Sequence, residues 1–312
     1  MDFDAAPLIA LGRSLKAEGY KFTCPTPLTI SRNNARASNA VAASLVDVFG
    51  WNRPFRADFL SSGLLSLMES GGILETRQHL LRSSVRFSSL AGELYIHSAY
   101  PTSGQDAVFF GPDTYRFVRF VRDHLIEMRR RPARVIDVCC GSGAGGLALG
   151  RLLPPTGQES LILSDINESA LRFASVNAII GGRPQARLAK GDLFTGLPEA
   201  DLIIANPPYL VDRSQRSYRH GGGGRGIDLA LRIAIEGLQH LASGGQLLLY
   251  TGTPVVSGED CFLAKLEPEL NRHGTTYSYE ELDPDVFSEE LDQPAYTDVD
   301  RIALVAVAIN AS

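Results

Sequence analysis

The fold is decided by one stretch of this sequence, Leu202-Ile203-Ile204-Ala205-Asn206-Pro207-Pro208-Tyr209. A short apolar run bounded by turn residues predicts a buried strand of a parallel sheet. The two prolines fix φ and remove two backbone donors, so the chain must leave the sheet in a stiff turn. Ligands of open α/β sheets bind outside the carboxyl ends of strands, and we therefore expect the functional site at this turn.

The turn has the chemistry to hold a planar NH2 group. Asn206 Oδ1 and the Pro207 carbonyl can accept its two hydrogens, and the Tyr209 ring can cover its face. Taken alone, the same four residues are also typical of an ordinary loop in which the asparagine forms a turn. The rest of the sequence has to decide between the two interpretations.

Composition indicates an ordinary globular protein without a membrane span. The chain has 312 residues, 44% hydrophobic and 21% charged, with a net charge of −5, which suggests about two domains and weakens broad nucleic-acid binding. The start is acidic and no apolar run approaches the ~20 residues of a membrane span. The four cysteines suggest no disulfide framework and we expect no metal site, so a reducing cytoplasm is the expected location.

From about residue 133, apolar strands alternate with helical stretches, which predicts a doubly wound α/β sheet of Rossmann-like type with an antiparallel last strand. Helices are expected at Thr114–Arg131, capped by Asp113, and at Ala144–Leu153, Asn167–Ile180, Ile227–Ala242 and Glu259–Arg272. Gly244-Gly245 should end a helix and admit the next strand. The seven predicted strands are Arg134–Val138, Leu161–Ser164, Arg187–Lys190, Leu202–Ala205, Gln246–Thr251, Thr276–Tyr279 and Arg301–Ile309.

The first hundred residues follow a different pattern. Helical periodicity is followed by two extended runs, Ser84–Phe87 and Glu93–His97, joined by Ala91-Gly92. Three helices followed by a hairpin resemble a winged-helix module. We therefore divide the chain into residues 1–104, a module for substrate recognition or cover, and residues 105–312, the α/β domain.

A glycine-rich loop follows the first strand of the sheet. Gly141-Ser142-Gly143-Ala144-Gly145-Gly146 opens a helix, so a ligand can approach the backbone at the helix N-terminus. The spacing of Gly141, Gly143 and Gly146 also matches a dinucleotide fingerprint. The glycines alone therefore leave both a nicotinamide and an S-adenosylmethionine (SAM) site open.

Acidic residues at successive strand ends favour SAM. Asp137 would repel a pyrophosphate but suits the cationic methionine part of SAM. Asp165, followed by Ile166, can hold two ribose hydroxyls, and Asp192 can accept from the adenine amino group beside Leu193. One such aspartate alone is better explained as a helix cap, but three in succession before Asn206 make coincidence improbable.

With these motifs, residues from about 109 to 309 resemble class I SAM-dependent methyltransferases that carry Asn-Pro-Pro-Tyr. The resemblance is to protein-glutamine N5-methyltransferases and to small-domain RNA guanine N2-methyltransferases. It implies a cofactor site at Asp137, Gly141, Gly143, Asp165 and Asp192, and catalytic Asn206, Pro207 and Tyr209. Gly226-Ile227-Asp228 resembles the Gly-Leu-Asp of the glutamine enzymes.

The chain departs from these families at two places. Cys139 stands where the first loop glycine usually lies, and the Glu-Pro before the later glycine-rich stretch is absent. The segment 212–226 contains Arg213, Arg216, Arg219 and Arg225, and we expect it to be a mobile lid whose arginines hold a substrate carboxylate or phosphate. A solvated surface loop is an equal alternative.

The resemblance implies SAM-dependent N-methylation of a planar amino group, on a protein glutamine or a related amide. Three alternatives stay open: methylation of an RNA or DNA base, methylation of a small metabolite, and an idle SAM-binding protein. The acidic residues between positions 280 and 300 are expected to form a solvated loop or a rim that attracts a cationic partner. The oligomeric state does not follow from the sequence.

Overall fold

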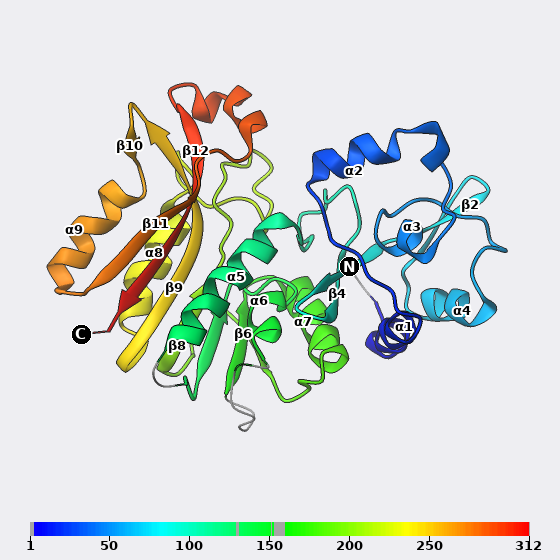
Figure 1. The fold of residues 1–312 in the computed structure, drawn as a ribbon, viewed down its shortest axis with the longest axis horizontal. Helices are drawn as coiled ribbons and strands as arrows, with labels where there is room; N and C mark the ends of the chain where they lie inside the picture. Colours follow the sequence, from blue (N-terminus) through cyan, green and yellow to red (C-terminus); the bar gives the residue numbers. More distant parts are fainter. Residues whose placement is uncertain (1–2, 129–130, 151, 153–159, 312) are drawn as a thin grey trace.

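The computed structural model describes residues 3–128, 131–150, 152 and 160–311. Its centre is a mostly parallel sheet in the order β11-β12-β9-β8-β5-β6-β7, with the short β10 paired to β9 (Figure 1). Strand β12 is antiparallel to both of its neighbours, as predicted. The strands are β5 Val135–Val138, β6 Leu161–Asp165, β7 Arg187–Lys190, β8 Ala200–Ala205, β9 Leu241–Val256, β10 Glu259–Asp260, β11 Tyr277–Asp283 and β12 Arg301–Asn310.

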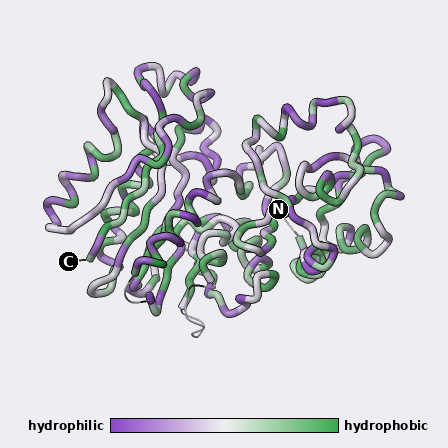
Figure 2. Tube along the Cα trace, viewed as in Figure 1, coloured by the Kyte–Doolittle hydropathy of each residue, from purple (hydrophilic) through white to green (hydrophobic). Residues whose placement is uncertain are grey.

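Helices cover both faces of the sheet because its strands are apolar on both sides. In β8, Leu202 and Ile204 join one hydrophobic cluster, whereas Ile203 and Ala205 join the other. Figure 2 shows hydrophobic residues concentrated along these strands. The first face carries α5 Pro112–Glu127, α6 Ala144–Ala148 and α7 Glu168–Ile180, and the second carries α8 Asp228–Leu238 and α9 Leu263–His273.

The strand order reverses at β5. The chain runs outward from β5 through β6 to β7 and then returns to β8, which pairs in parallel with the other side of β5. In such a doubly wound sheet the crevice for ligands opens at the carboxyl ends of the two strands at this switch point. The predicted fold class and the predicted seven-stranded path are therefore confirmed.

The prediction for Gly244-Gly245 was wrong. Helix α8 ends at Leu238, and both glycines lie within β9, where the pairing with β8 shifts register between Ala200 and Leu202. Gly244 has φ of 70°, a conformation that glycine adopts freely. These glycines therefore shape an irregular strand start instead of a helix end.

Other helix ends also differ from their predicted positions. Helix α9 begins at Leu263 because Glu259 and Asp260 form β10, and the Asp260 carboxylate accepts from the N–H groups of Phe262 and Leu263. Helix α5 begins at Pro112, one residue before the predicted cap. Helix α6 has only five residues, and the remainder of its predicted length lies partly outside the described residues.

The described part of the N-terminal module contains four α-helices and a 3₁₀ turn followed by two antiparallel hairpins, whereas three helices and one hairpin were predicted. Both Ala91 and Gly92 have positive φ, as a tight two-residue hairpin turn requires. No helix in the described part of the chain could cross a membrane. The elements are α1 Ala5–Ala17, α2 Pro27–Asn34, α3 Leu45–Phe49, α4 Ser62–Ser70, β1 Leu74–Arg77, β2 Leu80–Ser83, β3 Val85–Leu90 and β4 Glu93–Ser98; short 3₁₀ turns η1 Ala37–Asn39, η2 Ser288–Asp292 and η3 Pro294–Tyr296 complete the chain. Strands β3 and β4 form the predicted hairpin, and α2 and the β1–β2 pair were not predicted.

The module shares its hydrophobic core with the α/β domain. One cluster of buried residues continues from α1 through β3 and β4 into α5 and α7. The Phe3 ring stacks on Phe173 of α7 at 4.9 Å, and Arg172 donates to the Phe3 carbonyl. The boundary after residue 104 stays a prediction, but the continuous core means that the two parts stabilise each other.

A fully buried amide, Asn177 of α7, joins the module to the loop after β5. Its Oδ1 accepts from the Ile96 N–H at 2.7 Å, and its Nδ2 donates to the Ile96 carbonyl at 3.0 Å and the Ser142 carbonyl at 2.9 Å. Asn177 thus binds both backbone groups of Ile96 in β4, as the backbone of a neighbouring strand would, because its side-chain amide both donates and accepts hydrogen bonds.

We predict that Asn177→Ala destabilises the protein by roughly 2–4 kcal/mol, because it leaves several buried backbone groups without partners. Denaturant unfolding of the full chain measures this difference. Ser175→Ala is the matched control, because the Ser175 hydroxyl donates only within α7, to the Arg172 carbonyl. Equal stabilities of the two variants would contradict the assigned role of Asn177.

Candidate active site

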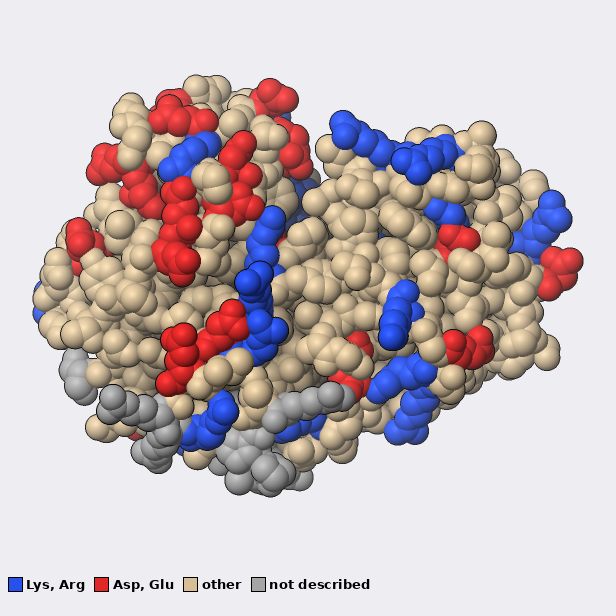
Figure 3. All heavy atoms as spheres, in the orientation of Figure 1, with Lys and Arg blue, Asp and Glu red and all other residues tan. Residues whose placement is uncertain are grey.

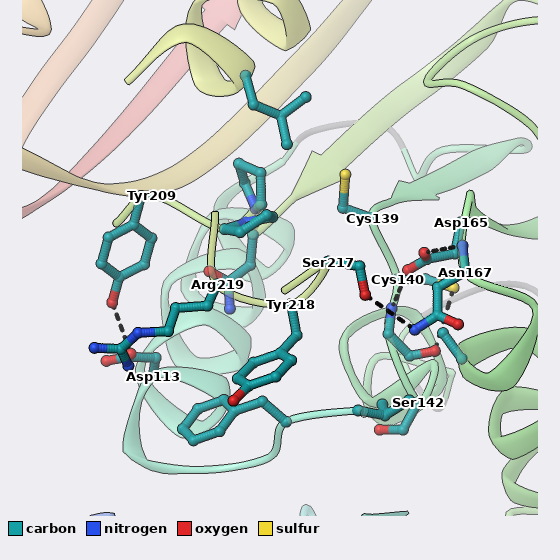
Figure 4. Close-up of a pocket in the computed structure, with 18 of the residues that line it drawn as sticks. Asp113, Cys139, Cys140, Ser142, Asp165, Asn167, Tyr209, Ser217, Tyr218 and Arg219 are labelled. Atoms are coloured by element: carbon teal, nitrogen blue, oxygen red, sulfur yellow. Dashed lines mark hydrogen bonds between the residues drawn. The ribbon is translucent and has the colours of Figure 1, made fainter. Parts of the chain in front are cut away.

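A pocket of about 510 Å³ opens at the carboxyl ends of β5, β6, β7 and β8. It brings together nearly all of the residues predicted for the site, as the close-up in Figure 4 shows for several of them. Gly143 is the exception and does not line the pocket. The predicted residues that do line it are Asp137, Cys139, Gly141, Asp165, Ile166, Asp192, Leu193, Asn206, Pro207 and Tyr209.

The loop after β5 has the backbone conformation of a glycine-rich loop. Cys139 has φ of 58° and Gly141 has φ of 55°. A non-glycine residue in this region is strained by about 1–2 kcal/mol. The backbone at Cys139 therefore keeps the shape that a glycine would favour, although the side chain differs from the family pattern.

Gly143 has a structural role. It precedes α6 with φ of 75°, and an added Cβ would lie 3.0 Å from Leu163 Cδ1 and 3.1 Å from Ala174 Cβ. The absence of a side chain allows α6 to lie close to β6 and α7. The structure thus gives Gly143 a role in helix–sheet packing, and its contact with the cofactor stays a prediction.

Asp137 is a buried acid at the bottom of the pocket. Its Oδ2 accepts from the Gly146 N–H at 2.7 Å, at the start of α6. Burial raises the pKa of Asp137 to about 7, against the opposing effect of the Gly146 hydrogen bond, and the nearby Asp165 raises it further. A cationic group placed beside Asp137 would favour its ionised form.

Asp165 and Asp192 follow the next two strands. Asp165 Oδ2 accepts from the Gly141 N–H at 2.8 Å and Oδ1 from the Asn167 N–H at 2.8 Å, and burial raises its pKa above the ordinary value. Asp192 lies further out and pairs with Arg232 of α8 at 3.1 Å. Each carboxylate oxygen has a second lone pair, so both residues retain capacity to accept from a ligand.

Asn206 and Pro207 lie where the site requires acceptors. The Asn206 side chain lines the pocket and has no hydrogen bond to any residue that the structure describes. No described donor reaches the Pro207 carbonyl either. Both oxygens of the turn are thus available to a ligand, as the sequence predicted.

The environment of Tyr209 differs from the prediction. Its ring packs so closely on the backbone of β9 that a Cβ added at Gly252 would lie 2.3 Å from Tyr209 Cδ2. Its hydroxyl donates to Asp113 Oδ2 at 2.7 Å (Figure 4). Tyr209 is therefore held by the core. Asp113, predicted as a helix cap, contributes its carboxylate to this contact, while Gly111 takes the capping position.

Three of the four arginines of segment 212–226, which the sequence offered as holders of a substrate carboxylate or phosphate, make ion pairs within the described part of the chain. Arg216 and Arg219 pair with Asp212, and Arg219 also pairs with Glu290. Arg225 pairs with Asp298 at 2.7 Å. Only Arg213 among the four makes no ion pair in the described part of the chain.

These ion pairs also revise the interpretation of the acidic segment. Figure 3 shows acidic side chains over β11, η2 and η3, across a notch from the basic side chains near α2. Glu290 is only 4% exposed and Asp298 binds Arg225, so these two residues anchor the segment 212–226 instead of forming a free rim. Phe287 and Glu289 line the pocket from the same region.

Ser217 and Tyr218 line the pocket from segment 212–226, which was predicted as a lid, but their contacts with the linker were not predicted. Tyr218 stacks on Phe109 at 6.3 Å and donates to the Thr102 carbonyl, while Ser217 donates to the Gln105 carbonyl at 3.1 Å. The linker from the N-terminal module therefore meets segment 212–226 over the pocket. Pro27 of α2 lines the same pocket from the module. The predicted lid included Ser217 and Tyr218, whereas no pattern in the sequence pointed to Pro27 in particular.

Among the described residues, no three His, Cys, Asp or Glu side chains are grouped to hold a metal ion. The arrangement instead offers carboxylates and two uncommitted oxygens to a polar ligand with several N–H and O–H donors. Such a set of acceptors can orient and polarise amino groups without a metal.

Comparison with known proteins agrees with this chemistry. The chain is 32% identical over 154 residues to the ribosomal protein uL3 glutamine methyltransferase of Xanthomonas campestris, covering 46% of this chain and 47% of that protein. It is 35% identical over 132 residues to the uL3 enzyme of Bordetella pertussis, covering 38% and 43%. It is 34% identical over 160 residues to the release factor glutamine methyltransferase of Chlamydia trachomatis serovar L2, covering 47% and 53%. The chain thus spans about half the length of the curated relatives it matches.

Solved structures share the fold at low sequence identity. Trm5b from Pyrococcus abyssi superimposes with a TM-score of 0.50 at 14% identity, over 76% of this chain and 62% of that one. Methanocaldococcus jannaschii Trm5 in complex with adenosine gives 0.50 at 12% identity, over 84% and 62%. The family model for the methyltransferase small domain matches residues 119–254. The matched part of the chain contains the strand ends and the Asn-Pro-Pro-Tyr turn.

Proposed function

We propose that the chain is a SAM-dependent N-methyltransferase that methylates the side-chain amide of a glutamine in a protein. The observation that carries the proposal is the pair of uncommitted acceptors, Asn206 Oδ1 and the Pro207 carbonyl, in one pocket with three strand-end aspartates. The similarity to glutamine methyltransferases that act on uL3 or on release factors supports a protein amide as the acceptor.

The residues of the pocket fit SAM by the chemistry of their polar groups. Asp137 suits the amino group of the methionine part, Asp165 the ribose hydroxyls and Asp192 the adenine amino group, with Ile166 and Leu193 beside the ring. Ile166 is 63% exposed, as expected for an apolar side chain that a ligand would cover. When bound, SAM supplies an electrophilic methyl group on a sulfonium.

The turn at Asn206 addresses the main difficulty of the reaction. An amide nitrogen is a weak nucleophile because its lone pair is delocalised into the carbonyl. Acceptors at Asn206 and Pro207 would bind both N–H groups, orient the nitrogen and favour a geometry in which its lone pair is available. The proton of the methylated nitrogen can then pass to water, since the cationic product is a strong acid.

A nucleic-acid acceptor is less favoured by the placement of the basic side chains. Among the arginines of the N-terminal module, Arg53 and Arg86 are buried and Arg82 is half-buried. Arg53 is also committed to Asp47. The remaining exposed arginines give little concentrated positive charge, which phosphate binding requires.

We also propose that residues 1–104 help to select the acceptor. Pro27 lines the pocket, and the adjacent Leu28 is 50% exposed at the same end of α2. An exposed leucine beside a pocket provides apolar contact area for a polypeptide. A cytoplasmic location is proposed on the four free cysteines.

The direct test is methyl transfer from labelled SAM to purified uL3, a purified release factor, transfer RNA and a metabolite extract in parallel. We expect label in a protein, located by mass spectrometry on a glutamine side chain. Label only in RNA or in a small molecule would replace the proposed acceptor.

For the cofactor, Asp165→Ala should weaken SAM binding by roughly 1.5–3 kcal/mol, the contribution of charge-assisted hydrogen bonds. Calorimetry of the folded variant measures the affinity. Asp201→Ala is the matched control, because Asp201 accepts from the N–H groups of Ala133 and Arg134 away from the pocket lining. An unchanged SAM affinity in Asp165→Ala would remove the ribose assignment.

For the acceptor, Asn206→Ala should lower turnover by roughly 10²-fold or more while SAM affinity stays nearly constant, as for loss of one positioned polar group. Steady-state kinetics and calorimetry on the same preparation separate the two effects. A parallel loss of SAM affinity and turnover would mean that Asn206 serves the cofactor or the turn itself.

For the module, Leu28→Asp should raise the KM for the protein acceptor by about 10-fold with SAM affinity and melting temperature unchanged, since it replaces apolar contact area with a charge. Ile126→Asp is the control: Ile126 is 58% exposed near the end of α5 and does not line the pocket. Equal KM values for the two variants would argue against acceptor binding at α2.

A further inference from the structure

Asp113 is a buried acid that lines the pocket but has no role in the methyl transfer proposed above. Its side chain is held at the start of α5, directly after the linker from the N-terminal module, and the residue is 6% exposed. Asp113 Oδ2 accepts from the Tyr209 hydroxyl at 2.7 Å, and Oδ1 accepts from the Tyr250 hydroxyl at 3.2 Å. Arg116 approaches Oδ1 at 3.4 Å.

Burying this carboxylate is unfavourable, and its compensation is weak. The neighbouring Arg116 is partly exposed and pairs more closely with Asp283, at 3.0 Å. Two neutral phenols and the N-terminal turn of α5 provide the remaining stabilisation. An apolar residue would fill such a site at lower cost, so the acid needs a further reason to be there.

The Tyr209 hydroxyl is the end of a rigid connection to the Asn-Pro-Pro-Tyr turn. The Tyr209 ring lies against Gly252 on β9, and its centroid is 6.1 Å from that of the Phe287 ring. These two contacts leave the ring little room to move. The two prolines that precede it carry fixed φ angles. A hydrogen bond at the tip of Tyr209 therefore restrains the positions of Pro207 and Asn206, two and three residues earlier.

The segment that follows Tyr209 is also fixed. Leu210 pairs with the chain at His220, with the Leu210 N–H donating to the Arg219 carbonyl and the Gly221 N–H donating to the Leu210 carbonyl. A Cβ at Gly221 would lie 2.7 Å from the Pro208 carbonyl oxygen. With strand β8 before the turn and this pairing after it, the side-chain anchor of the turn itself is Tyr209.

We propose that Asp113 is a positioning residue for methyl transfer: through the Tyr209 hydroxyl it holds Asn206 Oδ1 and the Pro207 carbonyl in the orientation that receives the acceptor nitrogen. The inference rests on the proposed function, because it assigns the geometry of the same turn. Asp113 does not contact the acceptor, and its effect passes through Tyr209. The role of Tyr209 is accordingly to hold the turn in position, and not to cover the face of the acceptor.

The kinetic test compares Asp113→Ala, Tyr209→Phe and their double variant in the full-length protein. Each single variant should lower kcat by roughly 10- to 100-fold, the scale of a small misplacement of reacting groups, while the Kd for SAM changes less than about twofold. The double variant should be no slower than the slower single variant, because both remove one connection. Multiplying effects in the double variant would overturn the proposal.

Two further variants separate positioning from simple stabilisation. Asp113→Asn keeps an oxygen that can accept from the Tyr209 hydroxyl, so it should recover most of the lost kcat. Tyr250→Phe removes the other phenol on Asp113 without touching the turn, so its kcat should stay near that of the wild type. A lowered melting temperature with unchanged kcat in Asp113→Ala would assign a structural role only.

A spectroscopic readout keeps the test independent of activity. The side-chain NH2 signals of Asn206, assigned with Asn206→Ala, should shift or broaden in both Asp113→Ala and Tyr209→Phe but not in Tyr250→Phe. Unchanged signals would overturn the inference even in an active enzyme. A wild type that methylates none of the acceptors but shows these shifts would overturn the proposed function and leave the positioning role supported.

Discussion

The parallel pairing of β5 with both β6 and β8 is the constraint on which the site depends. Because the chain reverses direction across the sheet at β5, the loops after four strands end at one edge and face one crevice. Asp137, Asp165, Asp192 and Asn206 are far apart in sequence, yet each needs only to follow its strand to reach the pocket. Short strands with apolar residues on both faces are sufficient to produce this arrangement.

The cover of the pocket depends on a different kind of interaction. Segment 212–226 has few apolar anchors, and its arginines pair with Asp212, Glu290 and Asp298. Neighbouring contacts join it to the linker at Gln105 and Thr102. Partly buried ion pairs of this kind fix geometry more than they add stability. The cover is thus specified by polar contacts, whereas the sheet is specified by hydrophobic burial.

This difference explains what the sequence could and could not predict. The strands and the acidic strand ends follow from local patterns, and the structure places them as expected. The partners of Arg219 and Tyr209 lie 71 and 96 residues away in the chain, and no local pattern identifies them. Gly244 misled the prediction because a glycine after a helix and a glycine in an irregular strand look alike in sequence. Long-range polar contacts are therefore the part of the site that needs the three-dimensional structure.

The cofactor loop shows how both kinds of interaction combine. Cys139 holds a strained left-handed conformation and α6 is only five residues long, so the loop gains little stability from its own residues. Two side chains from outside compensate: Asp165 of β6 accepts from the Gly141 N–H, and Asn177 of α7 donates to the Ser142 carbonyl. Asn177 also binds both backbone groups of Ile96 in the N-terminal module. The shape of the cofactor loop is therefore coupled to the docking of the module. A substitution in the loop is expected to alter the docking of the module, and a substitution in the module is expected to alter the shape of the loop.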